Sequence, residues 1–346
     1  MVRNRVTIKD VAKEAGVSIK TVSNVINNTG SMRPQTRKRV ESVMKKFGYT
    51  INVSARNLKT GSSKLIGLGV FDFSQPFGSY FCDKVIEAAR NLDYGVIVST
   101  YGVGGDGVST IIDETYRVGA DGWIFFVDGP LRNEGAILEQ PYPVVMASDY
   151  DSYGKVDHVT MPNFNSMHDV VGRLIDSGSK NIAVIGSPCE TFDYDAIMNA
   201  KEGTQELRLQ GYLTAYEDRG LAPEPSLFVP MTHGLTTFGG ASGMKKLLNS
   251  GRDFDAVICL NDAVAIGAMH EVTKHGIKIP EEMQIVGFDN VPEDNYSNPS
   301  LTSIDPHTEL YARRAVEMLI ERIEGYHGPV RSFESMYTLV KRGSTK

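Results

Sequence analysis

The fold of the N-terminal region is decided by the stretch VTIKDVAKEAGVSIKTVSNVI at residues 6–26. Thr7, followed three residues later by Asp10, has the form of a capping box, in which a hydroxyl and a carboxylate satisfy free amide groups at a helix start. Gly16 permits the left-handed backbone that ends many helices. Between them, apolar residues repeat with the spacing of one helix face at Ile8, Val11, Ala12 and Ala15. The pattern predicts a first short helix that ends at Gly16.

A second short helix is predicted directly after this turn. Ser18 is a good N-cap residue, and Val22, Val25 and Ile26 form an inward apolar stripe. Two short helices joined by a glycine-containing turn are a helix-turn-helix, whose second helix places its N-terminal residues against base edges in the major groove. The region is therefore predicted to bind DNA.

The outward positions of the second helix carry side chains suited to DNA. Lys20 can donate to guanine, Asn24 can pair with adenine, and Ile19 can touch a thymine methyl group. Exposure of a helix face to solvent explains a polar residue at any one of these positions. It does not explain all of these residues together with the helix caps and the glycine-containing turn. Further DNA contacts are predicted for small polar residues that can bond phosphates or that stand at the helix starts. They are Thr7, Ser18, Thr21, Ser23 and Asn27.

A third helix is predicted from Pro34 to about Phe47, because Pro suits a first helical turn and Gly48 suits the position after the last. Its basic side chains are expected to face phosphates. The segment 52–59 is too short to form a stable helix alone in water. We expect it to fold on DNA, with Leu58 as an apolar wedge in the minor groove.

Basic residues are concentrated in the first 63 positions of this 346-residue chain. Residues 1–63 contain 13 Lys or Arg and 3 Asp or Glu, a balance of +10, whereas the rest of the chain has a balance of −16. The split indicates a polyanion-binding head on an acidic body. With 41% hydrophobic and 23% charged residues, the composition excludes a mainly disordered, collagen-like or coiled-coil chain.

Four motifs in the head form a combined signature: Val6–Ser18, Thr21–Asn27, Thr36–Val40 and Ala55–Leu58. Together they resemble the head of the LacI/GalR family of bacterial transcription regulators. The resemblance places Ile19, Lys20 and Asn24 at specificity-setting positions. It places Ala55 and Leu58 in a minor-groove hinge helix. Lys59, next to Leu58, is also predicted to contact DNA. Where the family often has Val-Ser before the third helix, this chain has Met32-Arg33, so we expect a different cap and an added phosphate contact from Arg33.

From Lys64 onward, short apolar runs alternate with amphipathic stretches, which indicates an α/β fold with parallel sheets covered by helices. The alternation pauses at Tyr150–Asn163, which we interpret as a crossing between two lobes. Strands are predicted at Leu65–Phe71, Tyr94–Thr100, Gly122–Val127, Pro143–Met146, Ile182–Ile185, Ala256–Leu260 and Gln284–Phe288. Helices are predicted at Ser79–Leu92, Phe164–Asp176, Leu207–Arg219, Ala241–Leu248 and Ala263–His275.

Ligands of open parallel sheets bind outside the carboxyl ends of the strands. Asp72, Asp149, Asn261 and Asp289 directly follow predicted strands, although each alone is equally explained as a turn or helix cap. Carboxylate and amide groups suit the hydroxyls of a ligand, and aromatic residues cover its apolar faces. The aromatic candidates are Phe77, Tyr80 and Phe192.

The resemblance to the same family extends over the body through Cys259–Ala268, Ile279–Glu282, Ile285–Asp289, Pro299–Ile304 and Leu339–Thr345. It implies the two-lobed fold of type I periplasmic sugar-binding proteins, with three crossovers between the lobes. By motif, it assigns effector contacts to Arg208, Asn261 and Asp289. The expected domains are a helix-turn-helix at 1–50, a hinge helix and linker at 51–63, and an effector domain at 64–346. Within the effector domain, lobe 1 is expected at about 64–161 and 291–323 and lobe 2 at about 162–290 and 324–346.

Four features depart from the family pattern. Pro162-Asn163 replaces an Asp-Asn pair at the lobe crossing, and Asp305 replaces a Gln in the third crossover. Leu235 stands about where some members have a stacking Trp. The stretch between Gly186 and Arg208 is longer than usual. Four of its side chains are expected to enlarge or line the pocket: Asp193, Tyr194, Asp195 and Glu202.

These observations predict a repressor of carbohydrate-utilisation genes that binds a pseudo-palindromic operator as a homodimer and is released by a mono- or oligosaccharide. A corepressor-dependent regulator that senses a purine or another metabolite stays open, as does a sugar-binding protein without a regulatory role. A coiled-coil tetramer is disfavoured, because no heptad tail follows the last motif.

The sequence predicts no enzyme, cofactor or metal site, since it contains no dinucleotide-binding or phosphate-binding glycine motif and no metal-spaced Cys or His pair. Cys82, Cys189 and Cys259 are expected to be buried, unpaired residues in a reducing compartment. No signal peptide or membrane span is evident, which favours a cytoplasmic, nucleoid-associated protein with no membrane partner.

Overall fold

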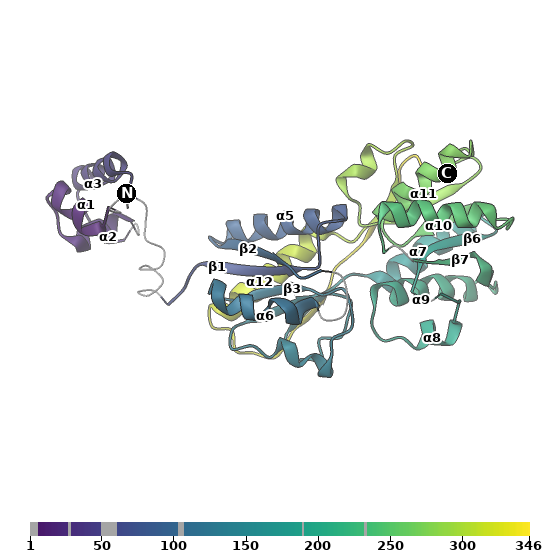
Figure 1. Ribbon diagram of the computed structural model, residues 1–346, viewed down its shortest axis with the longest axis horizontal. Coiled ribbons are helices and arrows are strands. Elements are labelled where there is room, and N and C mark those ends of the chain that lie inside the picture. Colours follow the sequence, from purple (N-terminus) through teal and green to yellow (C-terminus); the bar gives the residue numbers. More distant parts are fainter. Residues whose placement is uncertain (1–5, 27–28, 50–60, 103–106, 189, 232–233) are drawn as a thin grey trace. The chain divides into compact units, whose positions relative to one another are not determined.

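The computed structural model describes residues 6–26, 29–49, 61–102, 107–188, 190–231 and 234–346 (Figure 1). The chain separates into two compact units, Met1–Ser63 and Lys64–Lys346, which we call the head and the body. Four predicted DNA contacts lie outside the described residues: Asn27, Ala55, Leu58 and Lys59.

The described part of the head consists of α1 (Ile8–Ala15), α2 (Ile19–Ile26) and α3 (Pro34–Phe47). Each helix packs against the other two. Their shared core is formed by the apolar positions that helical spacing predicted, which confirms the three-helix arrangement. The buried core residues are Val11, Ala12, Ala15, Val22, Val25 and Val40.

The helix ends of the head follow the local chemistry of the sequence. The carboxylate of Asp10 accepts hydrogen bonds from the backbone N (2.9 Å) and Oγ1 (2.7 Å) of Thr7, and these bonds lower the pKa of Asp10. Gly16 ends α1 with a left-handed φ of 61°. Oγ of Ser18 accepts from the amide of Thr21 at 3.0 Å, so Ser18 caps α2 as predicted.

The first lobe of the body contains a parallel sheet of six strands among the described residues. The order across the sheet is β2-β1-β3-β4-β5-β11. The strands are β1 (Leu65–Val70), β2 (Gly95–Thr100), β3 (Trp123–Phe126), β4 (Val144–Ala147), β5 (Asp157–Thr160) and β11 (Ser332–Glu334). β1, β3 and β4 are almost entirely buried, as expected of strands covered on both faces.

The second lobe contains the other sheet, in the order β7-β6-β8-β9-β10-β12. Its described strands are parallel except for the edge strand β12, which pairs antiparallel with β10. The strands are β6 (Ile182–Ser187), β7 (Phe228–Pro230), β8 (Ala256–Cys259), β9 (Gln284–Phe288), β10 (Thr302–Asp305) and β12 (Thr338–Val340).

Helices cover both sheets (Figure 1). In the first lobe α5 (Pro76–Asn91) and α12 (Thr308–Ile323) pack against each other, and α6 (Gly107–Val118) packs against β1. In the second lobe α7 (Asn163–Asp176) packs with α9 (Thr204–Glu217), and α10 (Thr237–Asn249) packs with α11 (Asp262–Lys274). The shorter elements are α8 (Tyr194–Asn199) and the 3₁₀-helical segments η1 (Asn133–Leu138), η2 (Pro225–Leu227) and η3 (Pro292–Asn295).

The chain passes between the lobes after β5, after β10 and after β11, which gives the three crossovers that the resemblance implied. The predicted boundaries of the lobes need correction at two places. Residues 302–305 form β10 of the second sheet, so the return to the first lobe occurs after Asp305 and not at 291. Residues 332–334 pair with β5 in the first sheet, so the last crossing follows β11 and not residue 323. β10 and β11 each contain a single large apolar residue, Ile304 and Phe333, so no apolar run in the sequence revealed them.

Cys82 and Cys259 are buried and unpaired, whereas Cys189 lies outside the described residues. Burial raises the pKa of the Cys82 thiol to about 11, as expected of a structural and unreactive cysteine. No helix in the described part of the chain combines the length and the apolar composition that a membrane span requires.

Candidate functional site

The N-terminal end of α2 presents an apolar and a basic side chain to solvent. Ile19 is 46% exposed and Lys20 is exposed as well. Asn24 lies one turn after Lys20 on the same side of the helix. Asn24 is half-buried, and Gly30 packs closely against its side chain. A Cβ atom added to Gly30 would lie only 2.9 Å from Nδ2 of Asn24. The structure therefore brings the three predicted base-reading residues together on one face, with Asn24 the least accessible of them.

The hydroxyls predicted to contact phosphates are used at the helix starts. Oγ1 of Thr7 donates to Asp10, and the hydroxyls of Ser18 and Thr21 bond each other at 2.9 Å. Ser23 is half-buried. Arg33 occupies the N-cap of α3, is exposed and gives no side-chain cap, which is the departure expected from Met32-Arg33. Contact of these residues with phosphate stays a prediction.

A cavity of about 530 Å³ lies between the two lobes of the body, within the size range of small-molecule sites. It is formed at the carboxyl ends of strands from both sheets, the position expected for a parallel α/β fold. Seven of the nine predicted effector residues line it: Asp72, Phe77, Asp149, Arg208, Leu235, Asn261 and Asp289.

Two predicted lining residues, Tyr80 and Phe192, are not among those that line the cavity. On α5 the residue that joins Phe77 on the buried face is Phe81, one turn later, while Tyr80 lies under Nζ of Lys84, 5.6 Å from its ring centroid. Phe192 packs within the second lobe against Phe228, with ring centroids 4.5 Å apart. Their assignment to the pocket is wrong, because both rings serve local packing.

Arg208 on α9 is the central cation of the cavity and is only 3% exposed. Nε donates to Oδ1 of Asn163 at 2.8 Å, and Nη1 donates to the carbonyl of Leu260. The guanidinium lies 3.3 Å from the ring centroid of Phe288. Burial lowers the pKa of Arg208, while the carboxyl of Asp289 and those of two further aspartates raise it. These contacts fix the guanidinium in one orientation.

Asp289 follows β9 with a φ of 118°, a backbone conformation that is rare for a residue with a side chain. Burial raises the pKa of its carboxyl to about 8; Arg208 lowers the pKa, and Asp294 and Asp149 raise it further. A carboxyl that titrates near neutrality can donate to or accept from a hydroxyl. Backbone strain in a lining residue is typical of functional sites.

Asn261 is both a helix cap and a lining residue of the cavity. The cap and the cavity position, which the sequence left as alternatives, are therefore both present. Oδ1 of Asn261 accepts from the amide of Val264 at 2.8 Å at the start of α11. Its Nδ2 donates to the carbonyl of Leu235 at 3.0 Å and to Oε1 of Gln75 at 2.7 Å. Gln75 belongs to the first lobe, so this bond crosses the cavity.

Asp149 makes a second connection between the lobes. Its Oδ2 accepts from Oγ1 of Thr204 at 2.7 Å, its Oδ1 accepts from the amide of Met161 at 3.1 Å, and its carbonyl accepts from the amide of Gly203. Because Thr204 begins α9, the carboxylate ties the end of β4 to the helix that carries Arg208.

Several lining residues were missed in the sequence. Asp128 follows directly on the predicted strand Gly122–Val127, so the strand-end rule applied to that strand identifies it. Gln75 and Gln205 carry no such signal, since each stands at the start of a helix whose position only the fold reveals. The missed polar residues are Ser74, Gln75, Asp128, Tyr150, Ser187, Thr204, Gln205 and Thr236.

The long segment between Gly186 and Arg208 does not line the cavity through the four residues predicted to do so, which corrects that expectation. Asp193 accepts from the amide of Ala196 at 2.9 Å and caps α8, and the hydroxyl of Tyr194 bonds Glu217. Asp195 lies in the first turn of α8 and is exposed. Oε2 of Glu202 accepts from the amide of Asp151 at 2.7 Å. The segment therefore forms an outer helix and a further contact with the first lobe.

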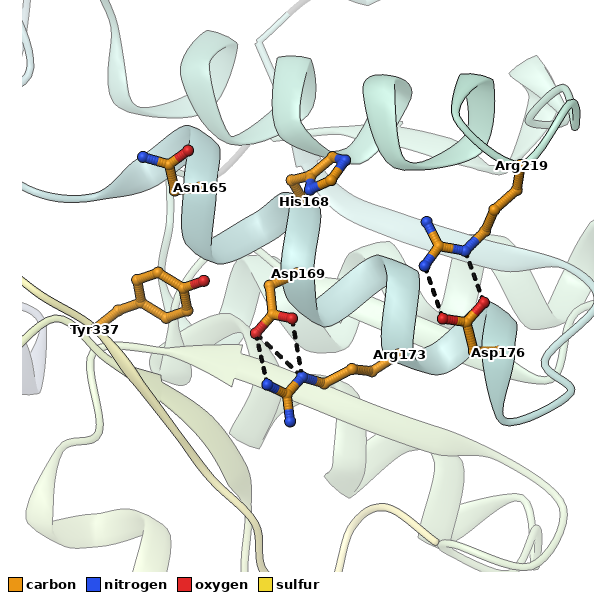
Figure 2. Close-up of a pocket in the computed structure, with 7 residues that line it drawn as sticks. All are labelled: Asn165, His168, Asp169, Arg173, Asp176, Arg219 and Tyr337. Atoms are coloured by element: carbon orange, nitrogen blue, oxygen red, sulfur yellow. Dashed lines mark hydrogen bonds and ion pairs between the residues drawn. The ribbon is translucent and has the colours of Figure 1, made fainter.

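A second cavity of about 550 Å³ lies over α7 (Figure 2). Arg173 forms paired bonds of 3.0 Å with both oxygens of Asp169, and Arg219 forms bonds of 2.8 and 2.7 Å with Asp176. Both guanidinium groups are thus already neutralised by carboxylates, so the interlobe cavity is the stronger effector site. The described residues contain no cluster of three His, Cys, Asp or Glu side chains that could hold a metal ion.

Comparison with known proteins agrees with this architecture. The chain matches the family model of bacterial regulatory proteins of the lacI family over residues 7–52, and that of periplasmic binding protein-like domains over residues 171–345. Catabolite control protein A of Priestia megaterium is 31% identical over 301 residues, which cover 86% of this chain and 87% of that protein.

Two solved structures are similar to the chain. A LacI-type transcription regulator from Bifidobacterium animalis subsp. lactis is 47% identical with a TM-score of 0.78, covering 82% of this chain and 99% of that one. The transcriptional regulator CelR in complex with cellobiose is 25% identical with a TM-score of 0.70, covering 98% of this chain and 100% of that one. With its helix-turn-helix head and its two-lobed body, the chain belongs to the lacI family of bacterial regulatory proteins and is a DNA-binding transcription regulator.

Proposed function

We propose that this regulator represses carbohydrate-utilisation genes and that a sugar bound between the lobes of the body releases it from its operator. The observation that carries the proposal is a cavity with charged and amide side chains in its lining, at the carboxyl ends of two sheets and in the same chain as a helix-turn-helix. Allostery of this kind requires a ligand that binds two states with different affinity. Open and closed arrangements of two lobes supply such states.

The lining of the cavity supports a sugar as the effector. The carboxyls of Asp72 and Asp289, the guanidinium of Arg208 and the amide of Asn261 are groups that bond hydroxyls. Phe71 and Phe77 provide apolar surface for the C–H faces of a ring. The similar regulator CelR has been solved with cellobiose, which points to the same class of ligand.

The junction between the linker and the body offers a route for the response. Lys64, the first residue of the body, donates its amide to Asp121 at 3.0 Å, and its Nζ lies 3.4 Å from Glu324 and 4.1 Å from the ring centroid of Tyr94. Glu324 follows α12 at the start of the segment that leads to β11, after which the chain returns to the second lobe. We infer that a change in lobe closure moves this segment and, through Lys64, the linker to the head.

We also infer that the protein binds its operator as a homodimer. A pseudo-palindromic operator requires two heads related by two-fold symmetry. The second lobe exposes two large aromatic side chains, Phe238 (68% exposed) and Tyr296 (88% exposed), of a kind that is enriched in protein interfaces. Sedimentation equilibrium of the purified protein tests this, with a mass of one chain as the contrary result.

The protein is expected to turn over no sugar and to act in the cytoplasm, where its DNA target lies. The central test is a gel-shift series over the upstream region of its own gene, at several salt concentrations and with sugars added. A sequence-selective shift that weakens with salt and is reversed by one sugar supports the proposal. Tighter binding on addition of ligand identifies a corepressor, and the absence of any selective shift contradicts DNA-binding repression.

A further inference from the structure

The charges of the interlobe cavity are strongly unbalanced. Among the lining residues that the structure describes, four are aspartates, at positions 72, 128, 149 and 289, and the one cation is Arg208. Two of the carboxylates already carry protein donors: Asp149 accepts from Thr204 and Met161, and Asp72 accepts from the amide and hydroxyl of Ser74. Hydrogen bonds from neutral donors orient a carboxylate, but they leave its negative charge in place.

The cation offers little to a bound anion. Nε and Nη1 of Arg208 donate to Asn163 and to the carbonyl of Leu260, and one face of the guanidinium is covered by Phe288. Its charge is offset by nearby aspartates, and Nη2, whose acceptor is the sulfur of Met161 at 3.9 Å, is left to donate to a ligand hydroxyl. Phosphate-binding arginines, by contrast, present a free pair of N–H groups for bidentate bonding.

The charged form of the Asp289 carboxyl is disfavoured, chiefly by burial and also by neighbouring carboxyls. Burial, together with Asp294 and Asp149, raises the pKa of this carboxyl to about 8 although Arg208 acts in the opposite direction. Even with Asp289 protonated, the described lining contains three further aspartates and a single guanidinium. A second anion placed here would meet the same unfavourable field.

The cavity is lined by hydrogen-bond donors as well as acceptors. The lining includes the amide and hydroxyl groups of Asn261, Gln205 and Thr236 as well as the carboxyls. A hydroxyl both donates and accepts, so it suits such a lining, whereas an ammonium group donates only. The described lining thus fits a neutral ligand with several hydroxyls better than a cation.

We propose that the effector of this regulator is an uncharged, hydroxyl-rich ligand such as a free sugar, and that the cavity excludes phosphorylated sugars and sugar acids. The inference rests on the proposed function and specifies the ligand of the same cavity. A free sugar must be supplied by glycoside hydrolysis or by uptake without phosphorylation. The regulator therefore senses its ligand before any phosphorylating step consumes it.

Thermal-shift titration of the full chain with matched ligands tests the inference. The neutral members are glucose, galactose, ribose, cellobiose and maltose. The anionic members are glucose 6-phosphate, galactose 6-phosphate, ribose 5-phosphate, glucuronate and galacturonate, and spermidine represents cations. We expect at least one neutral sugar to raise the melting temperature, and any anionic counterpart to bind at least about tenfold more weakly. An anion that binds as tightly as its neutral partner, a response to spermidine alone, or no response to any neutral sugar overturns the proposal.

Two variants sharpen the test. Asp72→Asn keeps the size of the side chain and removes one cavity charge, so it should narrow the difference in affinity between glucose or cellobiose and the anionic members. Asp113→Asn removes an exposed charge of α6 that does not line the cavity and should leave the difference unchanged. Equal effects of both variants would show that net charge, and not the cavity, controls discrimination. Gel shifts without ligand test the repressor function separately from the proposed ligand class. A protein that binds no operator in these gel shifts contradicts the repressor function, whatever ligand its cavity binds.

Discussion

Nδ2 of Asn261 in the second lobe lies 2.7 Å from Oε1 of Gln75 in the first lobe, and both residues line the cavity between them. The other donor bond of this amide, to the carbonyl of Leu235, stays within the second lobe. Because Oδ1 of Asn261 is held by the cap of α11, the amide cannot turn away without loss of that bond. A hydroxyl of a bound ligand must therefore share this donor with Gln75 or displace Gln75.

Gln75→Ala removes the acceptor of this interlobe bond. We expect faster amide hydrogen exchange in segments that meet across the cavity, above all at the start of α9, because the lobes then separate more often. The measurement is hydrogen–deuterium exchange of the full chain by mass spectrometry. Gln140→Ala is the matched control, since Gln140 bonds Tyr116 and Ile137 within the first lobe. Equal exchange in Gln75→Ala and the parent protein would show that the bond does not restrain the lobes.

Arg208 should matter for stability as well as for the effector. Arg208→Ala leaves the carboxyl of Asp289 without its neighbouring cation and Asn163 without its donor, so we expect a loss of about 3–5 kcal/mol in the free energy of unfolding. Arg208→Lys keeps the charge but loses the fork of donors, so it should fold, bind operator DNA and lose the response to sugar. Thermal unfolding and gel shifts with added sugar distinguish the two effects. An unchanged sugar response in Arg208→Lys would place the effector elsewhere.

Two carboxyls buried beneath the cavity should make stability depend on pH. Asp262 accepts from Oγ of Ser303 (2.6 Å) and from the amide of Val291 (3.1 Å), whereas both carboxyl oxygens of the buried Asp294 have no hydrogen-bond partner among the described residues. Burial raises the pKa of Asp294 to about 6 and that of Asp262 well above its usual range. Just above the ordinary pKa of an aspartate, the native pair therefore retains protons that the unfolded chain has released.

The sign follows from proton linkage. Between the ordinary pKa of an aspartate, about 3.9, and the raised native values, the native state binds more protons than the unfolded state, so stability falls as pH rises. We expect a higher melting temperature at pH 5 than at pH 8. The difference between these two melting temperatures should be smaller in Asp294→Asn, because the amide stays neutral at both pH values. Asp253→Asn, on an exposed loop, should keep the full difference. A melting temperature that rises from pH 5 to pH 8 would contradict the buried proton.

Much of the fold was predictable because long amphipathic segments carry a clear period. The helices around Val22, Val40 and Met167 and the buried strands such as Ile182–Ser187 repeat apolar residues at 3.6 positions or in continuous runs. β11 and β12 have three residues each and lie at sheet edges, so their burial follows no pattern that a sequence displays. The correct lobe for such strands depends on pairings between residues far apart in the chain.

The site was predictable where a local rule applied. Asp72, Asp149, Asn261 and Asp289 were found because each follows a strand, and all four line the cavity. Tyr80 failed because its direction depends on the rotation of α5, which the fold sets. Gln75 was missed because its role depends on a partner 186 positions later in the chain.

Lys20 provides the sharpest test of the head. It is exposed at the N-terminal end of α2, beside Ile19, where a major-groove helix meets base edges. If Lys20 donates to guanine, Lys20→Ala should cost about 1–3 kcal/mol on the preferred operator and relax the base preference at one position of each half-site. Lys38 on α3 is also exposed, and Lys38→Ala should weaken binding to all sequences alike. It should also reduce the slope of the logarithm of the binding constant against the logarithm of the salt concentration by about one. Selection from a randomised operator library at two salt concentrations measures both effects. The same selected sequences for Lys20→Ala and the parent protein would exclude Lys20 as a base-reading residue.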